Sequence, residues 1–310
     1  MIQIFGAGIA GTFLYHLLSR EGYEVSIHDV RSEVDCRCAW AIAYREAKEL
    51  YKLIDVDIDD YVLVKPDFIV ANGVYLKNKN AVVFDKKKLL EDLWTFEFRK
   101  TDAELIVDAT GAARAYLPPI ENDRLLPTLQ TLERHEAEEN IYVYVTTRGY
   151  AWAFPLGDGR WHIGAGATGS SELRSLIEKL RRKYGFEERG NVCGCAAKVR
   201  MLPPSRCRPF VAANTVGVGE AIGCVSGAGE GNAPALISAK ILFECLENLE
   251  VYENRILEEF EWIETEQKFV DAMLNGRKLE MLRLLPKIVE IERKRMVEHT
   301  VATMLKLLGL

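Results

Sequence analysis

The order of apolar and polar positions at the start of the chain predicts a strand, a turn, a helix and a second strand. Ile2, Ile4 and Phe5 form a short apolar run that we interpret as a buried strand. Apolar side chains at helical spacing follow over residues 12–20, and residues 24–28 return to a strand-like pattern. The turn between the first strand and the helix contains Gly6, Gly8 and Gly11. This order is typical of the opening half of a doubly wound α/β sheet.

The spacing of these glycines indicates a nucleotide site. We expect a tight turn at Gly6, close approach of a pyrophosphate at Gly8, and packing of the helix on the strand at Gly11. The pyrophosphate would lie at the helix N-terminus, where free N–H groups and the helix dipole favour an anion. Asp29 follows the second strand at the position of an acid that binds a ribose 2′-OH, which disfavours a 2′-phosphate. FAD and NAD both fit this unit.

The rest of the pattern predicts an α/β protein with a second sheet. Further strands are predicted at 61–64, 67–71, 74–76, 81–84, 96–100, 103–111, 141–147, 150–154, 161–166 and 216–219. Helices are predicted at 42–54, 86–94, 171–184, from 232 or 233 to about 249, and from 253 to the end. Asn72-Gly73 signals a hairpin turn, and Asp85 is a plausible N-cap. The segments 117–130 and 185–207 are predicted as loop or irregular structure.

Composition and charge restrict the class of protein. The 310 residues are 48% hydrophobic and 28% charged, as in a globular protein. The sequence contains no run of about 18 apolar residues, so it predicts no transmembrane helix. The chain starts directly in a strand, without a signal-like leader, so we expect a cytoplasmic protein. A net charge of −6 and the lack of a basic stripe argue against nucleic-acid binding.

The seven cysteines do not form a metal-binding pattern. Cys36-x-Cys38 and Cys193-x-Cys195 lack the C-x-x-C spacing of zinc and iron–sulfur sites, and no histidine lies close to them in sequence. We therefore expect no metal. Cys38 is interpreted either as a thiol beside a cofactor or as a buried structural cysteine.

Two later segments favour FAD over NAD. The strand in residues 107–112 ends in Ala109-Thr110-Gly111, where small residues let the backbone approach a nucleotide closely. In residues 217–232, Glu220 can accept a hydrogen bond from a ribityl hydroxyl. The Gly229-Glu230-Gly231 turn and the helix start after it can face the flavin pyrimidine, whose edge becomes anionic on reduction. NAD has no ribityl chain for such a segment to bind.

With these segments the sequence resembles the geranylgeranyl reductase family of flavoproteins, within the p-hydroxybenzoate-hydroxylase-like FAD enzymes. The resemblance covers about residues 1–245. It rests on the glycine fingerprint with Asp29, on Val107-Asp-Ala-Thr-Gly111, on Tyr150-x-Trp152-x-Phe154-Pro155 with Gly164 and Gly166, and on Gly219-Glu-Ala-Ile-Gly223 with Gly229-Glu-Gly231.

This resemblance implies an α/β fold with a Rossmann-type FAD-binding domain, a second antiparallel-sheet substrate domain and a helical C-terminus. The FAD-binding domain would be discontinuous, formed by 1–58, 81–116 and 208–250. The substrate domain would comprise 59–80 and 117–207, and the C-terminal helical region 251–310. The implied activity is reduction of isolated C=C bonds in isoprenoid chains by reduced FAD.

The resemblance also implies the site residues. Around FAD it places Gly6, Ala7, Gly8, Ile9, Ala10, Gly11, Asp29, Val30, Arg31, Arg37, Cys38, Ala39, Ala109, Thr110, Gly111, Gly219, Glu220, Gly229, Glu230, Gly231 and Asn232. Along the isoprenoid chain it places Tyr150, Trp152 and Phe154. The catalytic residues would be Cys38, Tyr150 and Trp152, with Cys38 or a water it orders as the candidate proton donor.

Three features depart from the family pattern. Glu220 stands where the family usually has Asp, the loop before Gly229 lacks the usual proline, and Asn232 stands where an apolar residue is common. The half of the site that binds AMP therefore matches the family more closely than the half that binds the ribityl chain and flavin ring.

Other functions and partners stay open at this stage. The alternatives are a flavin-dependent monooxygenase or halogenase, since halogenases carry a related Trp-x-Trp-x-Ile-Pro box, and a non-catalytic flavin- or lipid-binding protein. For a reductase we expect a prenyl-lipid substrate, as in archaeal-type ether lipids or prenyl precursors, and ferredoxin or NAD(P)H as electron donor. Residues 277–310 hold eight Lys or Arg against four Glu. They predict either a solvated helix face or peripheral contact with anionic lipid at the inner membrane face.

Overall fold

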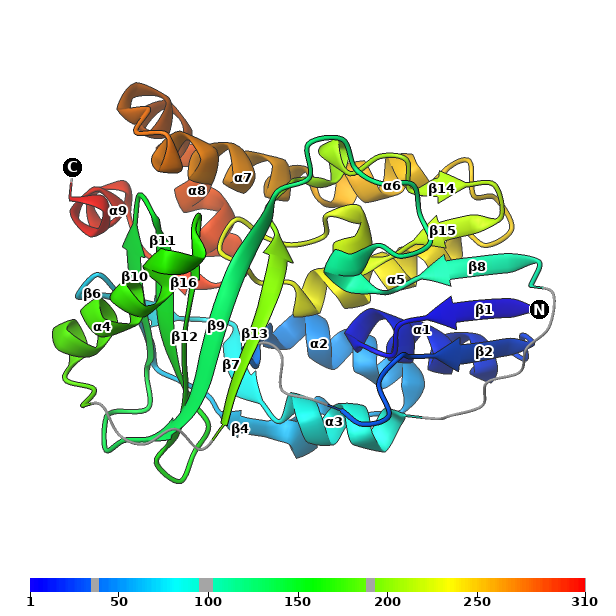
Figure 1. The fold of residues 1–310 in the computed structure, drawn as a ribbon, viewed down its shortest axis with the longest axis horizontal. Helices are drawn as coiled ribbons and strands as arrows, with labels where there is room; N and C mark the ends of the chain where they lie inside the picture. The colour runs from blue at the N-terminus through cyan, green and yellow to red at the C-terminus, as the bar shows by residue number, and fades with distance from the viewer. Residues whose placement is uncertain (35–38, 95–102, 188–192, 310) are drawn as a thin grey trace.

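The computed structural model describes residues 1–34, 39–94, 103–187 and 193–309 of the chain. Figure 1 shows two halves side by side, with the N-terminus at the far end of one half and the C-terminus at the far end of the other. One half is built on a mainly parallel sheet and the other on a larger, mainly antiparallel sheet. Arg37, Cys38 and the strand predicted at 96–100 lie outside the described residues.

The first sheet has the strand order β14-β15-β8-β1-β2. Strands β1, β2, β8 and β15 run parallel, and Ile4, Val107 and Val216 on them are completely buried. Their bounds are β1 (Ile2–Phe5), β2 (Val25–His28), β8 (Leu105–Asp108), β15 (Thr215–Gly217) and β14 (Val211–Ala212). This arrangement confirms the predicted α/β class with a mainly parallel sheet.

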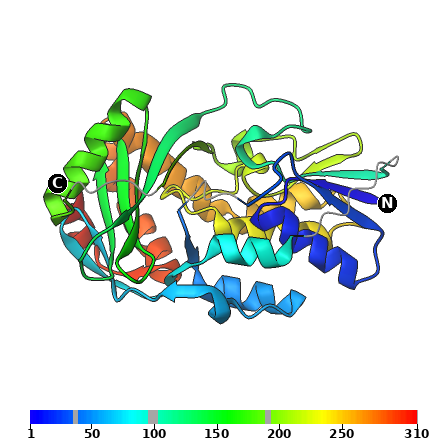
Figure 2. The same ribbon diagram turned by 60° about the horizontal axis from the view of Figure 1, so that its bottom comes forward.

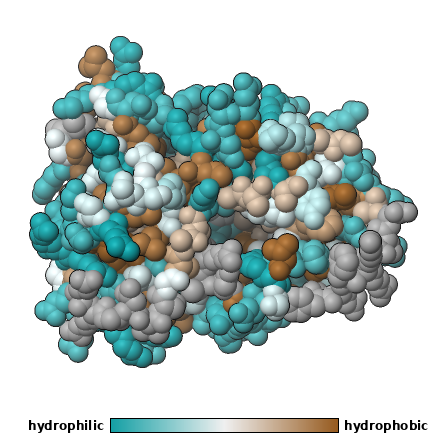
Figure 3. Space-filling view, in the orientation of Figure 1, coloured by the Kyte–Doolittle hydropathy of each residue, from teal (hydrophilic) through white to brown (hydrophobic). Residues whose placement is uncertain are grey.

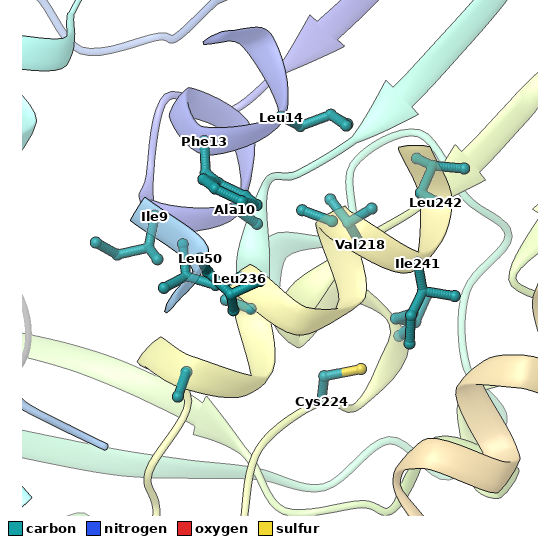
Figure 4. Packing of buried hydrophobic residues seen from close by; sticks show 14 of the residues in the cluster. Ile9, Ala10, Phe13, Leu14, Leu50, Val218, Cys224, Leu236, Ile241 and Leu242 are labelled. Carbon is teal, nitrogen blue, oxygen red and sulfur yellow. The ribbon is translucent and has the colours of Figure 1, made fainter. Parts of the chain in front are cut away.

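Helices α1 (Ile9–Arg20) and α5 (Asn232–Glu244) pack against each other on this half. Figure 4 shows their apolar side chains meeting, with Ala10 and Phe13 on α1 and Leu236 on α5. Phe13 and Leu236 are fully buried, and each such side chain contributes about 1.5–3 kcal/mol of hydrophobic stabilisation. This contact fixes the start of α1, and therefore the glycine turn, relative to the start of α5.

Two shorter helices, α2 (Tyr44–Tyr51) and α3 (Lys86–Leu93), complete this half. The predicted N-cap of α3 is confirmed, because the Asp85 side chain accepts the Lys88 N–H at 2.9 Å. Beside them lies a three-stranded sheet, β3-β7-β4, with bounds β3 (Ala41–Ala43), β7 (Ala81–Phe84) and β4 (Val62–Val64). The strand at 62–64 was expected in the second sheet, but it pairs here with β7.

The second sheet has eight strands in the order β13-β9-β12-β11-β10-β5-β6-β16. Neighbours are antiparallel except for β10 and β5, which are parallel. The bounds are β5 (Phe68–Ala71), β6 (Val74–Asn78), β9 (Leu125–Arg134), β10 (Ile141–Thr146), β11 (Gly149–Pro155), β12 (Arg160–Ala167), β13 (Cys193–Arg200) and β16 (Val297–Glu298). The predicted hairpin at Asn72-Gly73 joins β5 to β6, with φ of 51° and 86°.

Helix α4 (Leu173–Tyr184) covers one face of this sheet. Leu176, Ile177 and Leu180 of α4 pack on alternate residues of β11 and β12, among them Ala151 and Ile163. The residues between these, including Tyr150 and Trp152, therefore point to the opposite face of the sheet.

The predictions of loop at 117–130 and irregular structure at 185–207 were wrong for 125–130 and 193–200, which belong to the long strands β9 and β13, whereas 117–124 and 201–207 contain no strand. Pro127 made 125–130 look like a loop, since proline cannot donate to a sheet ladder. In the structure β12 pairs with β9 only from Thr128 onward, so the missing N–H of Pro127 lies beyond that ladder. Strand β13 is rich in small residues, with Gly194, Ala196 and Ala197, and has no apolar alternation to reveal it.

The C-terminal region is helical apart from β16. Helices α6 (Tyr252–Glu259), α7 (Glu261–Leu274), α8 (Lys278–Arg295) and α9 (Val301–Leu308) follow one another. In Figure 2 the last of these helices, orange and red, lie beside the large sheet. Across the described ranges, no helix is long and apolar enough to span a bilayer. Figure 3 shows apolar residues scattered among hydrophilic ones on one face of the molecule.

Candidate active site

The glycine turn between β1 and α1 combines close packing with one open position. A Cβ at Gly6, whose φ is 105°, would lie 2.3 Å from the Ala109 carbonyl oxygen, and one at Gly11 would lie 1.9 Å from the Gly6 carbonyl oxygen. These two positions therefore require glycine. A Cβ at Gly8 would meet nothing within 4 Å, so the space beside Gly8 is open.

The start of α1 is suited to an anion. Gly8 is the N-cap and has no side chain, no side-chain hydrogen bond caps this helix end, and the first turn carries no acid. The helix is 12 residues long, and the positive end of its dipole faces the open space beside Gly8.

Asp29 lies at the end of β2 against the same turn. Its carboxylate accepts the Ala7 N–H at 2.8 Å and the Arg31 N–H at 2.9 Å, and it is paired with the Arg31 guanidinium at 2.7 Å. Burial acts to raise the pKa of Asp29, but the hydrogen bonds from Arg31 and Ala7 lower it to about 2. Asp29 is therefore ionised at neutral pH. Of its predicted neighbours, Val30 points outward, with 96% of its surface exposed.

Trp94, which the sequence did not single out, closes one side of the turn. Its indole N–H donates to the Ala7 carbonyl at 2.7 Å, and the Arg31 guanidinium lies 5.8 Å from the centre of its ring. Trp94 and Ala7 are 87 positions apart in sequence, so only the fold brings Trp94 to this turn.

The end of β8 is organised by Asp108, which is fully buried. One carboxylate oxygen accepts from the Thr110 N–H and hydroxyl, and the other accepts from the Tyr116 and Leu117 N–H groups. This network holds the predicted Ala109-Thr110-Gly111 turn against Gly6.

Glu220 lies in a short 3₁₀ turn, residues Gly219–Ile222, directly after β15. Its Oε1 accepts the Arg200 backbone N–H at 2.6 Å, while Oε2 accepts no hydrogen bond from the described residues and lies 3.6 Å from where a Cβ of Gly111 would stand. Burial raises the pKa of Glu220, against the lowering effect of Arg200. Oε2 thus remains available to a ligand hydroxyl next to Gly111.

The glycine-rich loop at 226–231 lies against the aromatic strand of the second sheet. A Cβ at Gly229 would stand 2.4 Å from the hydroxyl oxygen of Tyr150, so the two halves touch at this point. Asn232, which departs from the family pattern, bridges two neighbouring elements: its side chain donates to the Ala41 carbonyl at 2.8 Å and accepts from the Lys86 ammonium at 3.1 Å. Ala39, close by in sequence, is half-buried.

Tyr150, Trp152 and Phe154 form a row of rings on the face of β11 opposite α4. Ring centres lie 5.5 Å apart for Tyr150 and Trp152, and 6.5 Å apart for Trp152 and Phe154. A Cβ at Gly164 would stand 2.4 Å from the Trp152 ring, and one at Gly166 would stand 3.2 Å from the Tyr150 ring. The two glycines of the sequence box thus allow the rings to lie flat on β12.

The three rings of this row have different surroundings. Burial, with a smaller effect of Glu220, raises the pKa of Tyr150 to about 12, which keeps its phenol protonated. The Trp152 indole N–H donates to the buried Gln130 at 3.2 Å. Phe154 packs into a core cluster with Trp40 and with Val64 and Val83 of the small sheet, and its predicted contact with substrate stays a prediction.

His162 extends the row and was missed by sequence reasoning. It pairs in register with Phe154, and its ring lies 4.6 Å from the Trp40 ring. Burial, with a smaller effect of Arg160, lowers its pKa to about 4, and its Nδ1 makes no hydrogen bond within the described part of the chain. The sequence could have indicated this position, because His162, Gly164 and Gly166 are spaced two residues apart and therefore lie on the same face of a strand.

The predicted site segments that the structure describes lie against one another. Gly6 meets Ala109, Ala10 lies beside Gly219, Gly111 faces Glu220, and Gly229 touches Tyr150. Cys38 and Arg37 lie outside the described residues, so their predicted place beside the cofactor is untested. In the described ranges no cluster of three His, Cys, Asp or Glu side chains could hold a metal ion.

Comparison with known proteins identifies the fold. No protein-family model matches the chain. An uncharacterized protein of Methanocaldococcus jannaschii is 27% identical over 92% of this chain and 94% of its own length. A solved structure of a geranylgeranyl bacteriochlorophyll reductase-like protein from Thermoplasma acidophilum is similar with a TM-score of 0.72, at 16% identity over 94% of this chain and 98% of that one.

Two further solved structures have the same fold. A probable FAD-dependent monooxygenase from Pseudomonas aeruginosa has a TM-score of 0.65 at 16% identity, over 92% of this chain and 99% of that one. A flavin-dependent brominase has a TM-score of 0.65 at 12% identity, over 91% and 93%. The chain thus has an α/β fold that it shares with a geranylgeranyl bacteriochlorophyll reductase-like protein, a probable FAD-dependent monooxygenase and a flavin-dependent brominase, which confirms the resemblance seen in the sequence at the level of fold.

Proposed function

We propose that the chain binds FAD non-covalently and is an FAD-dependent oxidoreductase. The observation that carries this proposal is the convergence of four separated segments, where Gly6 meets Ala109, Gly111 faces Glu220, and Gly229 touches Tyr150. A chain that bound only a nucleotide would not need the 217–232 segment and the strand of Tyr150 beside the glycine turn. The proteins of the same fold, among them a probable FAD-dependent monooxygenase and a flavin-dependent brominase, support this proposal.

The residues present fit FAD. The open space beside Gly8 and the uncapped start of α1 suit the pyrophosphate. The ionised Asp29 suits a ribose hydroxyl, although it shares its oxygens with Ala7 and Arg31. Oε2 of Glu220 suits a ribityl hydroxyl, because it lies next to Gly111. The Glu side chain is one methylene longer than the family's Asp, and it still places an oxygen there.

The reaction we propose is reduction of C=C bonds in isoprenoid chains, with archaeal-type ether lipids or prenyl precursors as the substrate class. When bound, reduced FAD would supply the hydride. An isolated alkene is a poor hydride acceptor, so the chain must hold it in a near-attack position and supply a proton. The apolar row of Tyr150 and Trp152 beside the glycine loop supports such a role.

Two groups of the chain are candidates for the proton. Cys38 is the one that the family resemblance implies. Tyr150 is the other, since its phenol is protonated at neutral pH and its oxygen lies against Gly229. For such a reductase, ferredoxin or NAD(P)H would be the electron donor.

A flavin-dependent monooxygenase or halogenase is the second candidate. It is favoured by the monooxygenase and the brominase of the same fold, whose TM-scores of 0.65 approach the 0.72 of the reductase-like protein. Oxygen separates the two functions, because a monooxygenase consumes O₂ and a reductase turns over without it.

The first experiment is the visible spectrum of the purified protein, followed by FAD titration of the apoprotein. Gly8→Val is the matched variant: a Cβ at this position meets nothing within 4 Å, so the fold should persist while the pyrophosphate is blocked. We expect FAD binding in the wild type and none in Gly8→Val at equal thermal stability. A wild-type protein that binds no FAD would contradict the proposal and favour a non-catalytic role.

The second experiment mixes dithionite-reduced enzyme with a prenyl substrate under argon. Reoxidation of the flavin with formation of a saturated product supports the reductase. Turnover only in the presence of O₂, with a hydroxylated or halogenated product, would instead establish the second candidate.

A further inference from the structure

The glycine-rich loop at 226–231 is held from behind by the C-terminal helices. The Gly227 N–H donates to Oε2 of Glu266, on α7, at 2.9 Å. A Cβ at Gly227 would lie 3.0 Å from the Glu266 backbone, so the loop rests directly on this helix. The next residue of α7, Gln267, donates to the Val225 carbonyl at 3.4 Å. The loop therefore has Tyr150 on one side and α7 on the other.

Arg295, the last residue of α8, stands between two carboxylates of this arrangement. Its guanidinium is 3.5 Å from Oε2 of Glu230, in the loop, and 4.0 Å from Oε1 of Glu266. It also lies over the ring of Trp262, with Cζ 3.2 Å from the ring centre. The exposed fractions of the Arg295, Glu230 and Glu266 side chains are 16%, 11% and 10%, so water screens these charges weakly.

In this cluster a single guanidinium faces two buried carboxyl groups, those of Glu230 and Glu266. Glu46 of α2 and Glu292 of α8 lie nearby, and they raise the pKa of Glu230 and of Glu266 respectively. Burial raises the pKa of Glu230 and of Glu266, while Arg295 acts to lower both. Arg295 thus contributes positive charge directly behind the loop, while burial favours the neutral forms of the two acids beside it.

We propose that Arg295 is a positioning residue for the proposed flavin site. It fixes the 226–231 loop through Glu230, and its charge favours binding of the reduced, anionic flavin over the oxidised form. The inference rests on the proposed function, because it assigns this loop to the flavin ring. It adds a contribution of the C-terminal helices, which the sequence resemblance did not cover.

The test compares Arg295→Met with the wild type. Methionine keeps an apolar stem over Trp262 but removes the charge. We expect the ratio of affinities for reduced and oxidised FAD to fall about tenfold, which lowers the midpoint potential of the bound flavin by about 30 mV for a two-electron couple. Arg295→Lys should restore most of the potential. Arg293→Met, an exposed residue two positions earlier on α8, is the matched control and should leave the potential unchanged.

The outcomes separate this inference from the proposed function. A wild-type protein that binds no FAD contradicts the proposed function and this inference with it. Wild-type and Arg295→Met proteins that bind FAD with the same potential overturn only the inference. Equal weakening of both redox forms would also overturn it, since it shows a purely structural role. If Arg295→Met does not fold, Glu230→Gln decides: a rise in potential supports the inference, and no change overturns it.

Discussion

Glu266→Gln tests how strongly the fold opposes a buried charge beneath the glycine-rich loop. Glu266 lies on α7 with its side chain 10% exposed. Burial raises its pKa from 4.5 to about 8, against the lowering effect of Arg295 and of the Gly227 hydrogen bond, and the nearby Glu292 and Glu230 raise it further. Glutamine keeps a carbonyl oxygen that can accept the Gly227 N–H, so the substitution removes mainly the ability to ionise.

The sign and size of the effect follow from the two pKa values. Between 4.5, the ordinary value, and about 8, the folded chain binds more protons at Glu266 than the unfolded chain does. The free energy of unfolding therefore falls as the pH rises through this window, and it changes no further above about pH 8. Each pKa unit corresponds to about 1.4 kcal/mol, so the full loss is about 5 kcal/mol. Loss on this scale is large against a typical stability of about 5–15 kcal/mol.

The assay is urea unfolding of the wild type and of Glu266→Gln at about pH 5 and about pH 8.5. We expect the variant to gain about 4 kcal/mol relative to the wild type between these two pH values. Glu261→Gln, an exposed position on the same helix, is the control and should follow the wild type. A wild-type-to-variant difference that is the same at both pH values would refute the reasoning, because Glu266 would then ionise alike in the folded and unfolded chains.

Three further predictions concern the proposed function. Asp29→Asn should weaken FAD binding by about 1–3 kcal/mol, because a hydrogen bond to a charged group is lost; calorimetric titration of the apoprotein measures it, and an unchanged dissociation constant speaks against the ribose assignment. Cys38→Ala should slow anaerobic reoxidation by a prenyl substrate about 10²–10⁴-fold if the thiol is the acid, whereas a rate within about twofold of wild type, at full flavin content, excludes that role. Residues 277–310 should bind anionic vesicles, since they carry excess positive charge and α8 exposes Leu279 by 75% and Leu282 by 44%; equal sedimentation with neutral vesicles would remove the electrostatic contribution.

Features encoded over a few neighbouring residues could be predicted from the sequence. The glycine turn, the Asn72-Gly73 hairpin and the Asp85 cap all appear in the structure as expected. Each depends on a backbone conformation or a hydrogen bond within a short stretch, so a single sequence carries the whole signal. The row of Tyr150, Trp152 and Phe154 on one face of β11 likewise follows from the two-residue period of a strand.

Only the tertiary structure decided which strands pair and which charges meet. Strands β9 and β13 were missed because their hydrogen bonds go to each other and to distant β12, and Pro127 disguised the first of them. Arg295 and Glu230 are far apart in sequence, and nothing local indicates that they share a buried cluster with Glu266. Such contacts form because apolar faces of separate helices and sheets bury one another, and this burial carries polar side chains together that no local pattern relates.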